Sequence, residues 1–379
     1  MRGVRTNLRG TALLIVVLAL FSFMWMACEN NQNPQTPGVQ EFVLHPSNPE
    51  VKTVMDVQLR HTEELMAKEG IIGTATGMTE DGKPAVLILA EFDIVENALA
   101  KNLAKPVPDE LEGIPTRVLV TGKLRALRKK PVPPDAVSHQ AIQTPPIQLG
   151  TSGGWQHDLA NGYCCGGTLG SLIQSGGKQY ILSNYHVFES DIVDGGNGIT
   201  AQTGDPIIQP ALIDVGCDAN QAQQVATLVK SSSLPNNNVD ASIAEVIPGM
   251  VDAGGAILEI GPLSAITVAA SIGQAVKKSG RTTGLTRSAI SGLNGTVSIT
   301  YDDECAGSTS FTKTFTGQII ITNRASKFLA GGDSGSLMVE DVDTNPRAIG
   351  LLFAGSNRTA IANPINDVLS FFSATMVGN

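Results

Sequence analysis

The length of 379 residues predicts two folded units, and hydrophobic residues (42%) supply enough apolar material for their cores. Forty glycines beside only 4% aromatic residues favour many short strands and tight turns over long helices. A formal net charge of −9 argues against nucleic acid or an anionic membrane face as the main partner.

Residues 1–27 have the pattern of an export signal. Arg2, Arg5 and Arg9 precede an uninterrupted apolar run from Thr11 to Ala27. A basic region followed by an apolar region predicts a signal peptide that is removed after export. A retained signal anchor is the alternative, because the run is at the short edge of what a membrane-spanning helix needs.

Cys28 follows a small residue at the end of this signal. In this position it resembles the lipidated cysteine of a bacterial lipoprotein, which implies a membrane-attached N-terminus. Residues 28–47 are polar, contain proline and suit a tether. The expected location is the outer side of the bacterial cytoplasmic membrane, or the outer membrane or cell envelope.

Residues 48–130 predict a small α+β domain. Asn48 and Pro49 are good N-cap and first-turn residues for a helix that runs to Gly70. Two strands joined by a turn at Asp81-Gly82 follow, then a second helix over 93–104 and a strand over 116–124. No cluster of titratable residues is found here.

Residues 131–153 are rich in proline and glycine and predict a linker. His139 lies within it and is expected to be solvated.

Residues 154–379 predict an all-β unit. About ten short apolar runs are separated by Gly, Asn, Asp and Pro, which is typical of barrels or a sandwich. The final run, residues 363–372, predicts a closing helix.

This unit also contains the remaining cysteines, which an exported protein can oxidise. The candidates for disulfides are Cys164, Cys165, Cys217 and Cys305. Three pairings are open, and adjacent Cys164 and Cys165 are expected to bond to different partners, for instance Cys217 and Cys305. Zinc is the alternative, but neither a histidine nor a Cys-x-x-Cys spacing supports it, so the sequence predicts no metal and no cofactor.

The segment "GGDSGS" over 331–336 places Ser334 in a glycine-rich turn before an apolar run. A serine hydroxyl needs a base to become a nucleophile, and histidine, with a pKa of about 6.5, is the usual one. All five histidines precede Ser334, which excludes the Ser-Asp-His order of the α/β-hydrolases.

His186 is the favoured base, because it follows the apolar strand "QYILSN" and a strand end holds a side chain rigidly. His157, on a glycine-rich loop, is its rival. Asp240 is the favoured carboxylate to orient the imidazole, since it begins an apolar strand where an unbonded carboxylate would be costly. Asp214, in "PALIDVG", is the alternative.

His186, Asp240 and Ser334 stand in the order His, Asp, Ser, in "SNYHV", "VDASIA" and "GGDSGS". Together these motifs resemble the trypsin/chymotrypsin-like serine peptidases over residues 164–372. The segment "KKSGRTTGLTRSAISG" also resembles the start of the second barrel in bacterial and plant members. The resemblance implies a mainly β fold of two six-stranded β-barrels, with the catalytic groups in the cleft between them.

The resemblance also implies an exported serine endopeptidase that cleaves polypeptide substrates. Ser334 Oγ would attack the carbonyl carbon, His186 would take and return its proton, and Asp240 would hold His186. The N–H groups of Gly332 and Ser334 would donate to the oxyanion, where glycine lets the backbone turn inward.

The same family places Phe328 near the base of the specificity pocket, with Gly355 and Ser356 along its wall. No acid occupies the base, which argues against a strict preference for Arg or Lys. In zymogen-activated members a freed N-terminus pairs with the aspartate before the serine. Here Asp333 needs another partner, or cleavage near "LRALRKK" (124–130) has to supply one.

Other functions remain open. A surface-tethered, non-catalytic binding protein on a protease-like scaffold is the main alternative, and an esterase would use the same residues with another pocket. The N-terminal α+β domain could be a pro-segment that occludes the cleft, a folding aid or a docking module.

Overall fold

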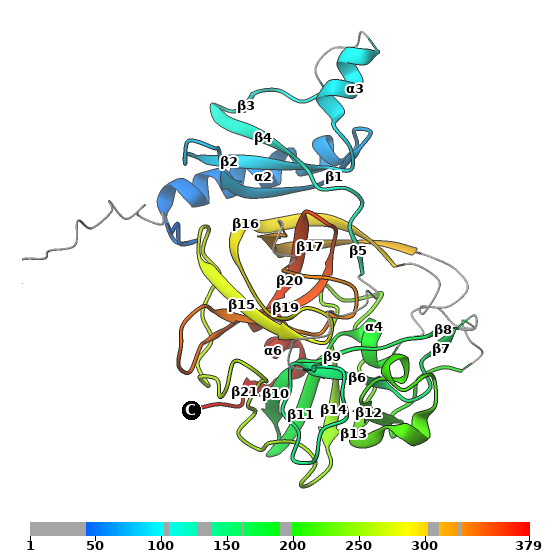
Figure 1. Cartoon of the computed structure of the whole chain (residues 1–379). Coiled ribbons are helices and arrows are strands. Elements are labelled where there is room, and N and C mark those ends of the chain that lie inside the picture. The colour runs from blue at the N-terminus through cyan, green and yellow to red at the C-terminus, as the bar shows by residue number, and fades with distance from the viewer. Residues whose placement is uncertain are drawn as a thin grey trace, which may run out of the picture. The chain divides into compact units, whose positions relative to one another are not determined.

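The structure, a computed structural model, describes residues 43–101, 106–126, 138–160, 163–189, 199–301, 311–323 and 328–379 (Figure 1). The predicted signal peptide, Cys28, most of the tether and Cys305 lie outside the described residues. Across these ranges every helix is too short or too polar to span a lipid bilayer.

The N-terminal region packs one long helix on a small sheet. Asn48 caps the helix, because its Oδ1 accepts a hydrogen bond from Glu50 N at 2.9 Å. The helix buries Val51, Val54 and Leu65. The elements of this region are α2 (Pro49–Met66), β1 (Ile71–Met78), β2 (Pro84–Ala90), α3 (Ile94–Ala100), β3 (Glu110–Leu111) and β4 (Ile114–Val120).

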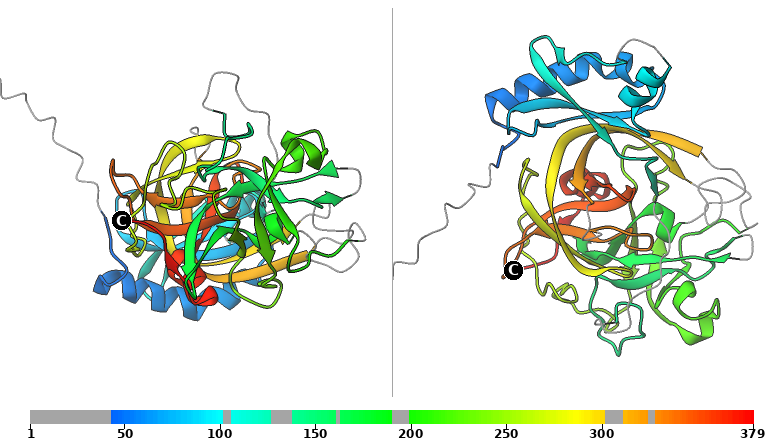
Figure 2. Two further views of the ribbon diagram at one scale, coloured as in Figure 1. Left: turned by 90° about the horizontal axis from the view of Figure 1, so that it is seen from below. Right: turned by 45° about the horizontal axis from the view of Figure 1, so that its top comes forward.

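This region shares a sheet with the rest of the chain. Strand β1 pairs antiparallel with β16 (Gly284–Tyr301), with Gly73 opposite Val297, so that β1, β2, β4 and β3 extend an eleven-stranded sheet (Figure 2). Gln58 of α2 adds a contact, since its Nε2 donates to Asn294 O at 2.9 Å. The division of the chain at residues 130 and 153 stays a prediction.

The first barrel closes through a bent strand. Strands β9 and β10 form the two halves of this bent strand, because Gly170 alone separates them. Strand β9 pairs with β6, and β10 pairs with β11. The pairings of β11 with β14, β14 with β13, β13 with β12 and β12 with β6 complete the ring. The strands are β6 (Thr151–Trp155), β9 (Gly167–Leu169), β10 (Ser171–Ser175), β11 (Lys178–Ser183), β12 (Pro206–Gln209), β13 (Gln223–Val229) and β14 (Ser242–Val246).

The second barrel closes through β15, which pairs with both β16 and β18. Its strands follow the order β15-β18-β19-β20-β17-β16. They are β15 (Ala275–Gly280), β16, β17 (Phe311–Thr322), β18 (Leu337–Glu340), β19 (Ala348–Gly355) and β20 (Thr359–Pro364), and helix α6 (Ile365–Phe372) follows. The predicted mainly β fold, a double six-stranded barrel preceded by an α+β region, is confirmed.

Shorter elements connect these parts. They are β5 (Arg125–Ala126), β7 (Leu159–Ala160), β8 (Tyr163–Cys164), α4 (Tyr185–Phe188), the 3₁₀ turns Leu212–Asp214 and Ala219–Gln221, and β21 (Thr375–Met376).

Residues 138–153, which the sequence analysis places in a linker, are packed. Ile147 and Leu149 are fully buried, and their N–H groups donate to Met250 O and Ala256 O. His139 is also buried, with Nδ1 2.8 Å from Gly150 O and Nε2 2.6 Å from the carboxylate of Glu259. The expectation of a solvated His139 is therefore wrong, because extended backbone rich in proline and glycine can still pair with a neighbouring segment.

Candidate active site

His186 lies on α4, the four-residue helix directly after β11. The neighbouring Val187 and Phe188 are buried in the core of the first barrel. Asn184 fixes the start of α4, since its Nδ2 donates to Asp240 O at 2.7 Å. The imidazole therefore sits on a rigid strand end, as its sequence context predicts.

Asp240 lies beside His186 and is fully buried. Its Oδ2 is 2.6 Å from His186 Nδ1 and accepts a hydrogen bond from Tyr301 Oη at 2.8 Å. Its Oδ1 accepts from Tyr185 N at 2.8 Å and, more weakly, from His186 N at 3.4 Å. These donors offset the cost of burying the carboxylate.

Ser334 lies in a tight turn of the second barrel. Gly332 and Gly335 flank it with φ angles of 92° and 91°, which favour glycine. Gly167 lies between the two sides of the site. A Cβ atom added to Gly167 would lie 2.6 Å from Val187 Cγ2 and 2.9 Å from Ser334 O. The turn of Ser334 and the helix of His186 thus pack against the same residue.

The proton-transfer hydrogen bond between Ser334 and His186 is not formed in this structure. Ser334 Oγ instead donates a long hydrogen bond of 3.4 Å to Phe353 O. His186 Nε2 is buried and has no hydrogen-bond partner in the described part of the chain. Catalytic hydrogen bonds are often long in unliganded enzymes and tighten only with substrate.

The orientation of the Gly331–Gly332 peptide is fixed by a side-chain hydrogen bond. Gly331 O accepts a hydrogen bond from Thr282 Oγ1 at 2.6 Å, so the N–H of Gly332 points to the opposite side of this trans peptide. A Cβ at Gly332 would meet Thr282 Oγ1 at 2.5 Å and Arg281 Nη1 at 2.7 Å. Only glycine fits there without a shift of its neighbours.

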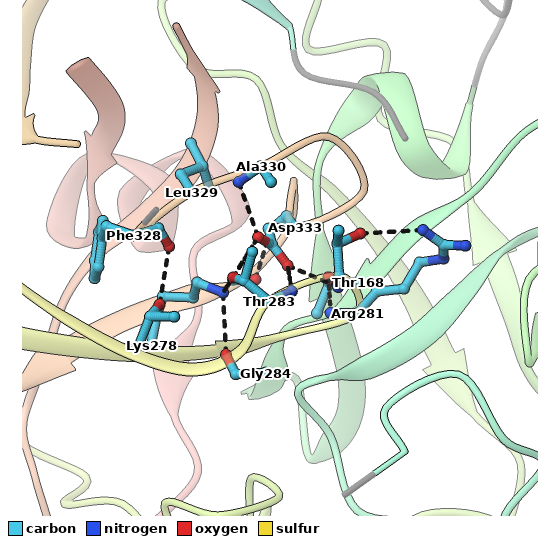
Figure 3. A network of polar contacts seen from close by, with 12 residues as sticks. Thr168, Lys278, Arg281, Thr283, Gly284, Phe328, Leu329, Ala330 and Asp333 are labelled. Atoms are coloured by element: carbon cyan, nitrogen blue, oxygen red, sulfur yellow. Dashed lines mark hydrogen bonds and ion pairs between the residues drawn. The ribbon is translucent and has the colours of Figure 1, made fainter. Parts of the chain in front are cut away.

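Lys278 is the partner of Asp333. The two side chains are fully buried, and Lys278 Nζ lies 3.3 Å from Asp333 Oδ2 (Figure 3). The carboxylate also accepts from Thr282 N at 2.8 Å, Ala330 N at 2.9 Å and Thr283 Oγ1 at 2.7 Å. Burial lowers the pKa of Lys278, and the charge of Asp333 partly opposes that shift. An internal lysine thus pairs with the aspartate that zymogen-type members pair with a freed N-terminus.

Asp214, the alternative to Asp240, has a different role. Both of its oxygens accept hydrogen bonds from the guanidinium of Arg281, and Ser152 Oγ donates to Oδ2 at 2.5 Å. Asp214 is therefore part of a buried ion pair and does not contact His186.

The residues expected in the specificity pocket are Phe328, Gly355 and Ser356. Phe328 is fully buried in the core of the second barrel. Gly355 and Ser356 lie at the end of β19, and Asn323 Nδ2 donates both to Ser356 O at 2.7 Å and to Leu329 O at 2.9 Å. The assignment of these residues to a specificity pocket stays a prediction.

Strand β5 covers the edge of β19 next to Ser334. Gly355 pairs with Arg125 and Ala354 with Ala126, in antiparallel register. Phe353, whose carbonyl contacts Ser334, is the next residue along β19. A substrate cannot pair with this edge while β5 occupies it.

Cys164 and Cys217 form a disulfide. Cys165 is also disulfide-bonded, and Cys305 lies outside the described residues. No group of His, Cys, Asp and Glu within the described ranges is arranged to hold a metal ion.

Comparisons with known proteins give the following similarities. The family model of the Nal1 C-terminal domain matches residues 236–363. No curated protein matches the sequence. Among solved structures, a glutamic acid-specific serine protease is 19% identical over 61% of this chain and 100% of its own, with a TM-score of 0.38. Cellulomonas bogoriensis chymotrypsin is 20% identical over 62% of this chain and 99% of its own, with a TM-score of 0.37.

A more distant similarity is to the MamO protease domain of Magnetospirillum magneticum, at 8% identity over 54% of this chain and 85% of its own, with a TM-score of 0.30. At these identities and TM-scores the similarities carry no argument about this chain. The strand pairings and the order of the barrels give the chain a chymotrypsin-like serine protease fold, with an N-terminal α+β region attached through β16.

Proposed function

We propose that this protein is an exported serine endopeptidase that hydrolyses peptide bonds through an acyl-enzyme. The observation that carries the proposal is the pairing of His186 Nδ1 with the buried carboxylate of Asp240 at 2.6 Å, with Nε2 unpaired among the described residues. The same fold also carries Ser334 in a glycine-rich turn. Together these features support His186 as a base whose Nε2 can accept a proton.

In the proposed reaction, Ser334 Oγ bonds to the substrate carbonyl carbon as His186 Nε2 takes the hydroxyl proton. The carbonyl oxygen becomes an oxyanion and accepts hydrogen bonds from the N–H groups of Gly332 and Ser334. His186 then gives its proton to the leaving amine, and water repeats the sequence on the acyl-enzyme. Losing one oxyanion donor typically costs about 3 kcal/mol of transition-state stabilisation.

The edge of β19 supports a polypeptide as the substrate. This edge already pairs with an extended segment, β5, through the backbone of Ala354 and Gly355. We also propose that residues 1–27 direct export of the protein and that Cys28 is lipidated. The Cys164–Cys217 disulfide supports an oxidising compartment.

The proposal is tested with a fluorophosphonate probe on the purified chain from Glu29 onward. We expect the wild type to gain the mass of one phosphonyl group, and Ser334→Ala and His186→Ala to gain none, because one lacks the nucleophile and the other its base. Labelling that persists in Ser334→Ala would place the reactive hydroxyl elsewhere and contradict the assignment.

Non-catalytic binding is the second candidate, and two observations favour it. Ser334 Oγ contacts Phe353 O and not His186, and β5 occupies the edge of β19. A folded protein that remains unlabelled even after β5 is loosened would support binding without turnover.

Loosening β5 is therefore a test of its own. Leu124 precedes β5 and is buried in the cluster that includes Tyr301 and Phe353. We expect Leu124→Ala to raise the labelling rate at least about tenfold, because losing a buried leucine weakens docking and the rate follows the fraction of open molecules.

Leu59→Ala is the matched control, since Leu59 is 55% exposed on α2 and its truncation leaves β5 in place. An unchanged or lower rate in Leu124→Ala, at an intact far-ultraviolet circular dichroism spectrum, would contradict the view that β5 blocks the site.

A further inference from the structure

Tyr301 is the last residue of β16, and its ring is fixed by aromatic packing. The ring stacks on Phe311 with centroids 4.7 Å apart and an interplanar angle of 5°. Phe315 contacts it at 6.5 Å, and the imidazole of His186 lies edge-on at 6.0 Å. The side chain is almost fully buried, so the hydroxyl group depends on protein partners for its hydrogen bond.

That partner is the carboxylate of Asp240. Tyr301 Oη donates to Asp240 Oδ2, the oxygen that also pairs with His186 Nδ1. Within the described ranges the other oxygen, Oδ1, accepts only backbone N–H groups, from Tyr185 and His186. Among the described residues, the Tyr301 hydroxyl is thus the one side-chain donor to Asp240 besides the imidazole itself.

We propose that Tyr301 is a positioning residue for the catalytic acid, an inference that rests on the proposed function. Two backbone bonds fix Oδ1, and the hydroxyl of Tyr301 fixes the rotation that aims Oδ2 at His186 Nδ1. Tyr301 thereby keeps the His186 ring in the tautomer and orientation that leave Nε2 able to accept the proton of Ser334.

The hydroxyl stays a donor throughout the working pH range. Burial, and then the negative charge of Asp240, raise the pKa of Tyr301 well above its ordinary value. No titratable side chain other than His186 and Tyr301 contacts the Asp240 carboxylate in the described part of the chain.

The strand that carries Tyr301 is held from several sides. Thr300 pairs with Arg125 of β5, and the N–H of Thr300 donates to Leu124 O at 3.1 Å. Further back, β16 pairs with β17 and with β1 of the N-terminal region. The position of the hydroxyl is thus set by β16, which is a different element from the helix that carries His186 and from the segment before β14 that carries Asp240.

Tyr301→Phe removes the hydroxyl and retains the aromatic packing. We expect its fluorophosphonate labelling rate to fall about ten- to a hundredfold at the pH plateau, because a small misplacement of a catalytic group has an effect of this size. The half-maximal rate should also move to higher pH, since a carboxylate with one donor fewer attracts the imidazolium more strongly.

Tyr180→Phe is the matched control, because Tyr180 lies on β11 and packs at the edge of the first-barrel core. If Tyr301 acts through Asp240, then Tyr301→Phe has no further effect in an Asp240→Asn background. A wild-type rate and pH profile in Tyr301→Phe, or an undiminished effect in the Asp240→Asn background, overturns the inference.

A spectroscopic measurement separates this inference from the proposed function. The proton on His186 Nδ1, bonded to a carboxylate at 2.6 Å, is expected as a far-downfield NMR signal that Tyr301→Phe shifts and Tyr180→Phe does not. This shift in a protein that never labels would refute the peptidase and retain the positioning role. If the wild type is labelled and the NMR signal does not move in Tyr301→Phe, the peptidase is retained and the positioning role is refuted.

Discussion

Asp240→Asn is expected to lower the labelling rate of Ser334 by about 10⁴-fold while the fold is retained. The carboxylate of Asp240 accepts the Nδ1 proton of His186, which leaves Nε2 as the acceptor. An asparagine can donate to Nδ1 instead, and the proton then moves to Nε2, where it blocks transfer from the serine. The rate is measured by intact mass against time, beside the thermal unfolding midpoint.

Asp218→Asn is the control for that change. Asp218 caps a 3₁₀ turn of the first barrel on the protein surface and accepts a hydrogen bond from Asn220 N. Its replacement should leave the labelling rate unchanged. A loss of less than about tenfold in Asp240→Asn would contradict the role of Asp240 as the orienting acid.

Lys278→Met is expected to lower the free energy of unfolding by about 3–5 kcal/mol, because it leaves the buried carboxylate of Asp333 without its counter-ion. The loop that carries Gly332 and Ser334 depends on the same carboxylate, so labelling should fall as well. Urea unfolding followed by fluorescence measures the first effect.

The double variant Lys278→Met with Asp333→Asn is the informative comparison. Replacing both charges removes the unpaired carboxylate, so much of the stability lost in Lys278→Met should return. The two residues do not interact if the double variant is less stable than Lys278→Met by as much as Asp333→Asn alone is less stable than the wild type.

The lowered pKa of Lys278 gives a second signature. Between that lowered pKa and the ordinary value of 10.5, the unfolded chain binds more protons at this residue than the folded chain does. The free energy of unfolding therefore rises with pH across this window. In Lys278→Met this rise of the free energy of unfolding with pH should be missing. Unfolding curves at several alkaline pH values measure the difference.

The candidate site was predictable where its signals are local. His186 follows an apolar strand, Asp240 lies just before one, and the glycines around Ser334 mark a turn that few residues adopt. Tyr301 and Lys278 carry no such signal, because each is an ordinary residue of a strand and meets its partner only across the folded barrels. The pairing of Tyr301 with Asp240 spans 61 residues of sequence.

The fold was predictable in its class and less so at its joins. Short apolar runs separated by turn residues indicate barrels, but they do not reveal that β1 pairs with β16. The two-residue strand β5 is too short for any periodic pattern. Around Ile147 and Leu149, proline and glycine suggest a linker although both side chains are buried.

The pairing of β1 with β16 determines what a cut in the chain would do. If a protease severed the backbone between Ala126 and Ser138, the fragment ending at the cut would still be held by the β1–β16 ladder and by Gln58 on Asn294. The nicked protein would migrate as two pieces under denaturing conditions and as one particle under native ones. Its N-terminal piece would then behave as a bound subunit, whose departure leaves β16 with an open edge.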